Sequence, residues 1–319
     1  MKGRKVLITG GAGFVGSNLV GELAGKNEIV VLDNLHTGVV TNLDPFMGKI
    51  ELQTLDAEDI FQVDFKPDVI FHLGMYSSTP MYKENRNLVH KVVDGTVQVL
   101  EFAKRNKSSV VLASSSSIYN GHPVPQSEEM VPKVTDFYTE ARLYAERLSE
   151  LYAKMFGLKA VCLRFFSVYG PGERSKGRFA NLVSQFMWDL EEGRSPVIYG
   201  DGSQTRDFVY VKDVVDACLL AAESGKSGVF NVGTGKSHTI NEMLDKVMAH
   251  LGRHKKPVHV DIPISNYVMH TQADTKKAKR GLGFSAKYSL DEGLTLMLGQ
   301  KARKSVLQKT TSLSPTARA

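Results

Sequence analysis

Near its start the chain carries a glycine-rich turn whose residue types could bind a diphosphate. The turn follows the apolar stretch Lys5–Thr9 and precedes the helical pattern Ser17–Leu23. A turn without Cβ atoms lets backbone N–H groups approach a pyrophosphate, and the dipole of the following helix favours negative charge there. In this context the spacing predicts a dinucleotide site. The cofactor-binding residues predicted in the turn are Gly10, Gly13, Phe14, Val15 and Gly16.

Two acidic residues follow at the ends of later apolar runs. Asp33 comes directly after Ile29–Leu32, at the place where a carboxylate accepts hydrogen bonds from the ribose hydroxyls of a dinucleotide. Its charge would repel the 2′-phosphate of NADP, and no arginine follows in Asn34–Thr41, so NAD is the predicted cofactor. Asp56, after Glu51–Leu55, is a candidate acceptor for the adenine amino group, although a solvated turn aspartate explains it equally well.

Positioning these residues requires a parallel sheet. Short apolar runs alternate with amphipathic stretches, which is typical of βαβ units with strands buried on both faces. The clearest helical periodicity extends over Phe137–Phe156 and stops at Gly157. The buried strands predicted are Lys5–Thr9, Ile29–Leu32, Val69–Leu73, Val110–Ala113 and Lys159–Phe166.

The length of 319 residues exceeds the usual size of one hydrophobic core, so a main domain with a smaller lobe is expected. The strand and helix alternation loosens in two separate stretches, from about Gly172 to Tyr199 and from about Ser237 to Ser289. We therefore expect an NAD-binding domain from residues 1–168 and 205–236, a second lobe from 169–204 and 237–300, and a disordered tail at 301–319.

The composition narrows the possible partners. The net charge of +6 suits an anionic partner, but the basic residues are spread out and not interleaved with aromatics as in a nucleic-acid groove. We expect no nucleic acid, and diphosphate ligands account for the charge.

The chain has neither an apolar run of about 18 residues nor a signal peptide, so we expect a cytoplasmic protein without a membrane segment. Cys162 and Cys218 stand in apolar runs and predict buried thiols, and the histidines show no metal-ligand spacing.

Several longer stretches resemble the extended short-chain dehydrogenase/reductase family, specifically its nucleotide-sugar epimerases and dehydratases. The matching stretches are Thr9–Gly16, Asp33–Leu35, Phe71–Leu73, Ala113–Tyr119, Tyr138–Arg147, Leu163–Gly172, Gly200–Val215 and Asn231–Gly235. The resemblance implies an α/β fold, a Rossmann doubly wound parallel sheet with a smaller C-terminal α/β lobe that closes over a nucleotide-sugar substrate. It also implies cofactor contacts from Asn34 and Leu73, and a homodimer formed through a helix pair that includes Tyr138–Phe156.

The family's chemistry uses a Ser or Thr together with a Tyr-x-x-x-Lys helix, whose tyrosine matches Tyr138 and whose hydroxyl residue matches Ser115. The resemblance implies that Tyr138 is the base on a sugar hydroxyl while hydride passes to the nicotinamide, and that Ser115 shares a hydrogen bond with that hydroxyl. A free phenol has a pKa of about 10, so it needs a nearby cation. Arg142 stands where the family has lysine. It keeps a charge on the same helix face but cannot reproduce the ammonium's bonds to the nicotinamide ribose.

The resemblance also implies a set of substrate-binding residues. Epimerases of UDP-glucuronate are similar to this chain in having a triple-hydroxyl stretch, a hydroxyl in place of asparagine at 167 and an arginine at 174, a combination that can hold a carboxylate. Serines in turns are also common without any such role. Arg206 matches the family's nucleotide-clamping loop, and His270 stands near where members often have another arginine. The predicted substrate-binding residues are Ser116, Ser117, Ser167, Arg174, Arg206 and His270.

The residues after Ser115 discriminate between reactions. Family 4,6-dehydratases need an acid pair there to eliminate water, and the decarboxylases usually keep a glutamate, whereas this chain has Ser116 and Ser117. We therefore expect a UDP-sugar 4-epimerase that oxidises C4 transiently and returns the hydride, with UDP-glucuronate as one candidate substrate. Two alternatives stay open. One is another NAD-dependent sugar-nucleotide enzyme, such as a dehydratase without the acid pair, and the other is a non-catalytic binding protein in which Arg142 marks the loss of activity.

Overall fold

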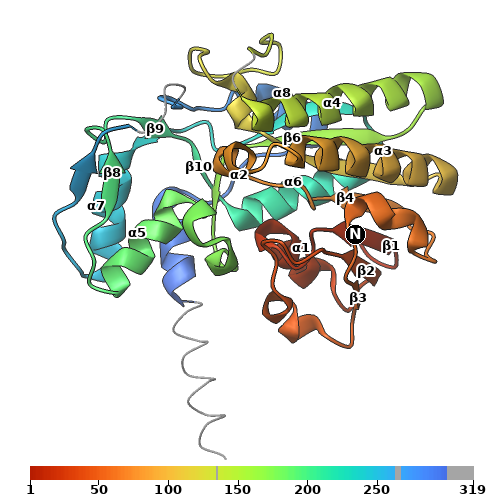
Figure 1. The fold of residues 1–319 in the computed structure, drawn as a ribbon, viewed down its shortest axis with the longest axis horizontal. Helices are drawn as coiled ribbons and strands as arrows, with labels where there is room; N and C mark the ends of the chain where they lie inside the picture. Colours follow the sequence, from red (N-terminus) through yellow and green to blue (C-terminus); the bar gives the residue numbers. More distant parts are fainter. Residues whose placement is uncertain (134–135, 263–266, 300–319) are drawn as a thin grey trace, which may run out of the picture.

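A computed structural model describes residues 1–133, 136–262 and 267–299 of the chain (Figure 1). The tail predicted at 301–319 lies outside the described residues. Figure 1 shows a main body built around a central sheet, with a smaller lobe beside it that contains α5 (Leu182–Glu191), α7 (Ile240–Leu251) and β8 (Val197–Tyr199).

The centre of the main body is a seven-stranded sheet in the order β11-β6-β5-β4-β1-β2-β3, in which all neighbouring strands pair in parallel. This is the strand order of a doubly wound dinucleotide-binding fold, with β11 added at one edge. It confirms the predicted fold class. The strands are β1 (Lys5–Thr9), β2 (Glu28–Leu32), β3 (Glu51–Gln53), β4 (Val69–His72), β5 (Ser109–Ser115), β6 (Ala160–Phe165) and β11 (Gly228–Val232).

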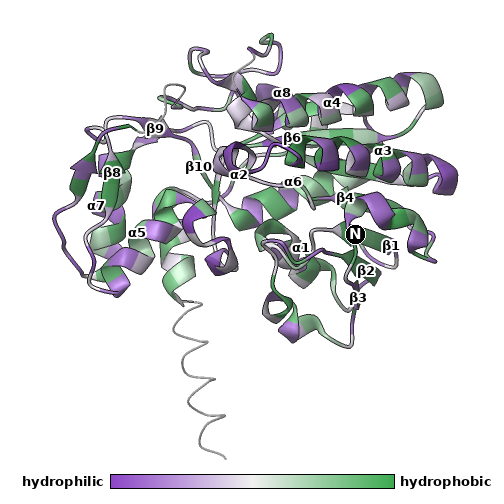
Figure 2. Cartoon of the chain, viewed as in Figure 1, coloured by the Kyte–Doolittle hydropathy of each residue, from purple (hydrophilic) through white to green (hydrophobic). Residues whose placement is uncertain are grey.

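Helices cover both faces of this sheet, because successive strand residues point to opposite sides. Val6 and Ile8 of β1 belong to the core beneath α1 (Phe14–Leu23) and α6 (Val211–Glu223), whereas Leu7 belongs to the core beneath α3 and α4. Helix α3 spans Leu88–Asn106. Figure 2 shows hydrophobic strands in the central sheet and, around them, helices that carry both hydrophobic and hydrophilic residues. The near-continuous apolar runs that predict these strands follow from burial on both sides.

Helix α4 spans Phe137–Phe156, as its periodicity predicts. Asp136 caps its first turn in a reciprocal capping box with Thr139, and Gly157 ends it with a positive φ of 68°. Its outward face leaves Leu151 and Met155 exposed. This is the helix through which the family resemblance implies dimerisation.

The smaller lobe is formed by two segments far apart in the sequence. Strand β8 (Val197–Tyr199) pairs in parallel with β13 (Val258–Val260), and α5 (Leu182–Glu191) packs on α7 (Ile240–Leu251). The buried side chains here include those of Leu290, Leu294 and Met297 in the helical stretch 290–299. Helix α8 (Lys276–Leu282) lies within the range expected for this lobe, yet it packs against β11 of the main sheet.

The connecting elements are short. They are α2 (Thr79–Glu84), β7 (Ser167–Tyr169), β9 (Thr205–Arg206), β10 (Phe208–Tyr210), β12 (His238–Thr239) and the 3₁₀ turns η1 (Val40–Asn42), η2 (Asp44–Phe46), η3 (Ala57–Gln62), η4 (Ser116–Tyr119) and η5 (Arg174–Phe179). Strand β7 pairs with β10, and β9 pairs with β12.

Both cysteines are free and buried, as predicted. Burial raises the pKa of Cys162 and of Cys218 to about 12, so both thiols stay protonated at neutral pH. No helix in the part of the chain that the structure describes is long and apolar enough to span a bilayer. Among the same residues, no group of three or more His, Cys, Asp or Glu side chains could hold a metal ion.

Candidate active site

A cavity of about 520 Å³ lies where the carboxyl ends of the central strands face the smaller lobe. In doubly wound sheets this edge is where ligands bind. The structure brings all the predicted site residues into the cavity wall except Arg174 and His270. Those in the wall are Gly10, Gly13, Phe14, Val15, Gly16, Asp33, Asn34, Asp56, Leu73, Ser115, Ser116, Ser117, Tyr138, Arg142, Ser167 and Arg206.

The glycine turn is shaped by close backbone contacts. Gly10 has a φ of 72°, and a Cβ there would lie 2.6 Å from the Cα of Gly74. A Cβ on Gly16 would collide with the carbonyl oxygen of Gly10. Gly13 is the N-cap of α1 and provides no side-chain cap, so the first amides of the helix have no acceptor from that side chain. The backbone amides at this helix end can therefore donate hydrogen bonds to a pyrophosphate.

Asp33 is held rigidly beside this turn. Its side chain is 6% exposed. One carboxylate oxygen accepts the amide of Ala12 at 2.9 Å, and the other accepts the amide of Leu35 at 2.8 Å. Burial raises the pKa of Asp33, and the hydrogen bonds from these backbone amides act in the opposite direction. The carboxylate is thus fixed at the cavity wall before any ligand binds.

Asp56 lies nearby but is already engaged with side chains. Asn34 donates to one of its oxygens at 2.5 Å, and the ammonium of Lys91 lies 3.3 Å from the other. The hydrogen bond with Glu58 raises the pKa of Lys91, and the contact with Asp56 adds to this. The adenine contact expected from Asp56 remains a prediction.

Tyr138 and Ser115 both reach the cavity, from the first turn of α4 and the end of β5. Tyr138 is 7% exposed, and its ring packs against that of Tyr82 with centroids 5.5 Å apart. The hydroxyl oxygen of Ser115 accepts the amide of Ser117 at 3.1 Å. Its own proton therefore remains for another acceptor. A fixed phenol and a fixed hydroxyl can together hold and deprotonate a ligand hydroxyl.

Arg142 is almost completely buried beside them, at 3% exposure. Its Nη1 donates to the carbonyl of Ala113 at 3.0 Å, and its Nη2 donates to the carbonyls of Tyr76 at 2.6 Å and Met75 at 3.3 Å. Its Cζ lies 5.2 Å from the centre of the Tyr138 ring. The charge expected near the phenol is present, and the guanidinium also ties the end of β5 to the turn after β4, which the sequence did not reveal.

The turn after β4 is also held by hydrogen bonds at Thr9 of β1. The Nδ1 of His72 lies 2.8 Å from the hydroxyl oxygen of Thr9, which also accepts the amide of Gly74 at 3.1 Å. Burial, with the charge of Arg142 adding to it, lowers the pKa of His72 to about 3. His72 is therefore neutral at any working pH and is a structural member of this turn.

On the lobe side of the cavity, hydrogen bonds to backbone carbonyls hold the side chain of Arg206 in place. Its guanidinium donates to the carbonyls of Val268 at 2.5 Å and Met269 at 3.1 Å, and it stacks on the ring of Tyr267 at 5.4 Å. Tyr267 packs edge-on against Tyr199, and both line the cavity. Neither tyrosine is identifiable from the sequence as a site residue, because nothing in a single sequence separates a lining aromatic from a core one.

The two remaining predicted residues lie elsewhere. Arg174 is ion-paired with Glu192 at 2.8 Å and stacks on Trp188, with its side chain 66% exposed. The Nδ1 of His270 lies 3.1 Å from the hydroxyl oxygen of Thr205. The structure therefore does not bring Arg174 to the predicted carboxylate site. The basic residue of this segment that does line the cavity is Lys176, which no motif in the sequence distinguishes from its basic neighbours.

Comparison with known proteins identifies the family of this chain. Residues 6–233 match the model of the NAD dependent epimerase/dehydratase family. The chain belongs to this family. It is 32% identical to a putative UDP-glucose 4-epimerase of Methanocaldococcus jannaschii, over 91% of this chain and 95% of that protein. It is also 32% identical to UDP-glucuronic acid decarboxylase 6 of Arabidopsis thaliana, over 92% of this chain and 87% of that protein.

A solved structure of the same family agrees with the fold. The UDP-N-acetylglucosamine 4-epimerase from Methanobrevibacter ruminantium M1, in complex with UDP-N-acetylmuramic acid, superposes with a TM-score of 0.89 at 29% identity, covering 95% of this chain and all of that one. The family depends on NAD. The uncapped end of α1 and the fixed Asp33 carboxylate fit the diphosphate and a ribose of this cofactor.

The charge of Asp33 should determine the choice between NAD and NADP. We expect the parent protein to bind NAD far more tightly than NADP, and Asp33→Asn to narrow the gap, because the amide keeps an acceptor oxygen but no longer repels a 2′-phosphate. The parent's NAD affinity should also fall as the pH decreases through the raised pKa of Asp33. Titrations of NAD and NADP binding at several pH values measure the cofactor preference and its pH dependence. Asp33→Asn is the control, because its NAD affinity should lack this pH dependence. Equal affinities for the two cofactors in the parent would contradict the role of Asp33.

The bonds of Arg142 should make it important for stability. Arg142→Lys keeps the charge, but a single ammonium cannot span the carbonyls at the ends of both strands. An unsatisfied buried carbonyl costs about 1–3 kcal/mol, so we expect a loss of about 2 kcal/mol for Arg142→Lys and more for Arg142→Met. Urea unfolding measures this, with Arg147→Lys on the exposed face of α4 as the control. Parent-like unfolding of both Arg142 variants would show that the strand ends do not need the guanidinium.

Proposed function

We propose that this protein is an NAD-dependent UDP-sugar 4-epimerase. The observation that carries the proposal is the chemistry beside the phenol, where Ser115, Ser116 and Ser117 line the cavity together with Tyr138. The carboxylates in the described cavity wall are those of Asp33, Asp56 and Glu173, and each is bonded at another part of the wall. A base with hydroxyl partners suits reversible oxidation of a carbinol, whereas elimination of water requires a further acid beside the hydroxyl.

NAD would be held by the glycine turn and Asp33, and it would supply a hydride acceptor and donor for C4 of the sugar, which must turn over as the ketosugar for the hydride to reach its opposite face. Tyr138 takes the proton of the 4-hydroxyl as the hydride leaves, and gives it back when the carbonyl is reduced. Ser115 donates its free proton to the same oxygen, which fixes the hydroxyl for transfer. The buried guanidinium of Arg142 lies beside this phenol, with its Cζ 5.2 Å from the centre of the Tyr138 ring.

Two of the similar proteins and one sequence difference support this choice. The archaeal relative and the solved structure described above are named as 4-epimerases. The plant relative is named as a decarboxylase of UDP-glucuronic acid, and decarboxylases of this type usually keep a glutamate after the catalytic hydroxyl, where this chain has Ser116 and Ser117. Epimerisation at C4 does not require a glutamate at this position.

Removal of the phenolic hydroxyl tests the mechanism. The parent protein should interconvert a UDP-sugar and its 4-epimer, and Tyr138→Phe should lower turnover by about 10²–10⁴-fold, because it deletes the general base. NAD should stay bound, since the helix is unchanged. Chromatographic analysis of the sugars gives the rates, and Tyr144→Phe on the exposed face of α4 is the matched control. A non-catalytic binding protein would turn over none of a panel of UDP-, GDP- and dTDP-sugars, and activity that survives Tyr138→Phe would assign the base to another residue.

UDP-glucuronate is the second substrate that we propose to test. Ser116, Ser117 and Ser167 all line the cavity, so three hydroxyls are available to a sugar carboxylate. Hydrogen bonds to a charged group are worth about 1.5–3 kcal/mol each, which corresponds to about tenfold or more in affinity. We expect UDP-glucuronate to bind at least about tenfold more tightly than UDP-glucose, and Ser167→Ala to reduce this preference. Calorimetric titration measures it. Arg174→Ala serves as the comparison, since a preference that depends on Arg174 would refute the assignment to the hydroxyls.

A further inference from the structure

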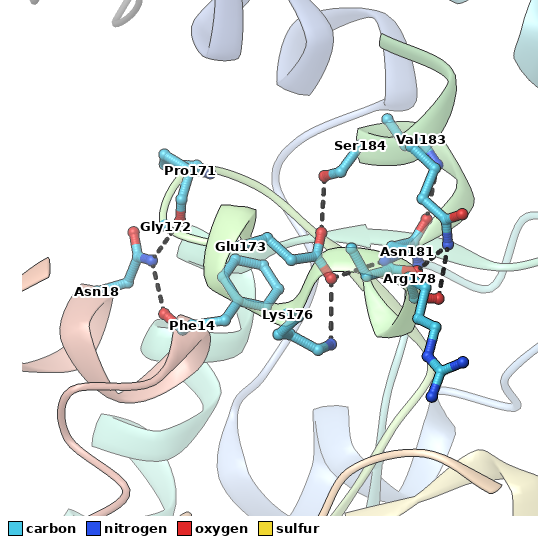
Figure 3. A network of polar contacts seen from close by, with 12 residues as sticks. Phe14, Asn18, Pro171, Gly172, Glu173, Lys176, Arg178, Asn181, Val183 and Ser184 are labelled. Atoms are coloured by element: carbon cyan, nitrogen blue, oxygen red, sulfur yellow. Dashed lines mark hydrogen bonds and ion pairs between the residues drawn. The ribbon is translucent and has the colours of Figure 1, made fainter. Parts of the chain in front are cut away.

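The segment Glu173–Asn181 connects the smaller lobe to the cavity wall and is tied to the main domain at two places. At its N-terminal side, just before Glu173, Asn18 of α1 donates to the carbonyl of Pro171 at 2.8 Å, while the same amide also donates to the carbonyl of Phe14 in its own helix at 2.9 Å, as Figure 3 shows. At the other end, the guanidinium of Arg178 donates to both carboxylate oxygens of Glu84 in α2, at 2.7 and 2.9 Å. The segment therefore bridges the two parts that enclose the ligand.

Three basic residues occur in this segment, and the structure separates them by environment. Arg174 and Arg178 are 66% and 71% exposed, and each is paired with a glutamate outside the cavity. Lys176 is only 16% exposed and lines the cavity. It is the basic residue of this segment that a ligand in the cavity can reach.

Lys176 is held in the wall by a buried carboxylate. Glu173, 1% exposed, lies 3.2 Å from the ammonium of Lys176. Glu173 also accepts the amide of Asn181 at 2.8 Å and the hydroxyl of Ser184 at 2.7 Å, which fixes its position (Figure 3). An ammonium has three donors. The contact with Glu173 leaves two of them for a ligand.

The ammonium of Lys176 also stands 5.6 Å above the ring of Phe14, the first residue of α1. The first turn of this helix contains no acidic residue, and its N-cap provides no side-chain acceptor. A diphosphate at this end of the helix therefore meets backbone amides from the main domain on one side and the lobe's cation on the other.

We propose that Lys176 is a ligand for the cofactor diphosphate, contributed by the smaller lobe. Its flexible four-carbon stem lets the ammonium move from above Phe14 to a phosphate oxygen while Glu173 remains beside it. Bound cofactor then holds the segment Glu173–Asn181 across the cavity, because one of its side chains bonds the ligand seated on α1. The inference rests on the family's use of NAD and is independent of which sugar reaction the protein catalyses.

Equilibrium titration of the full-length protein, stripped of bound nucleotide, tests this assignment. Lys176→Met should weaken the binding of NAD and of ADP-ribose, which keeps the diphosphate but lacks nicotinamide, by about tenfold each. Lys176→Arg should restore most of that affinity, since it restores the charge. Arg174→Met, two residues away and paired outside the cavity, is the matched control and should bind both nucleotides as the parent does. The affinity for UDP-glucose should not change in Lys176→Met.

Two results would overturn the proposal. Parent-like affinity of Lys176→Met for NAD and ADP-ribose would make Lys176 a partner of Glu173 alone. Weaker binding of UDP-glucose with unchanged binding of NAD would assign the ammonium to the diphosphate of the sugar nucleotide.

A measurement on the parent protein covers the case in which Lys176→Met does not fold. Acetic anhydride modifies accessible lysines, and mass spectrometry quantifies the modification at each one. NAD and ADP-ribose should both protect Lys176 several-fold, while the exposed Lys83 of α2 is modified equally with and without nucleotide. Unchanged modification of Lys176 in the presence of saturating NAD would refute the contact.

Discussion

The guanidinium of Arg142 joins two strand ends in the wall of the cavity. One strand end is the carbonyl of Ala113 in β5, and the other is the turn of Met75 and Tyr76 after β4. Ligands of a doubly wound sheet bind at these ends, so the shape of the site depends on how far apart they are held. A planar fork with several donors can span two separate sets of carbonyls, which a point-like ammonium cannot. In this chain the residue proposed to supply a charge beside Tyr138 also holds the two strand ends together.

The floor of the site is built from backbone rather than from side chains. Gly10 approaches Gly74 so closely that neither position leaves room for a Cβ, and the hydroxyl of Thr9 accepts the amide of Gly74. The turns after β1 and β4 are thereby locked together. The glycine pattern is thus required first by the protein's own packing, and the access that it gives a diphosphate follows from the same absence of side chains.

The sequence predicts those features of the structure that depend on neighbouring residues better than those that depend on contacts between distant residues. Strand β1 and helix α4 have the bounds that their apolar patterns predict, because burial on two faces and a cap at each end are local properties. The bonds of Arg142 could not be predicted, since their acceptors are carbonyls that any residue carries. The choice of Lys176 over Arg174 could not be predicted either. Gly177 breaks the helical geometry of this short segment, so no periodicity determines which basic side chain faces inward.

Phe14 belongs to two structures at once. Its backbone forms the first turn of the helix whose uncapped end fits a diphosphate, while the residue is only 6% exposed and belongs to the same hydrophobic cluster as Tyr169 and Val211. Replacement of the smaller lobe by a different one would therefore also disturb the proposed nucleotide site. A different lobe would have to provide a new cavity for this ring, so the evolution of substrate choice in such a chain is constrained by the packing of one aromatic side chain.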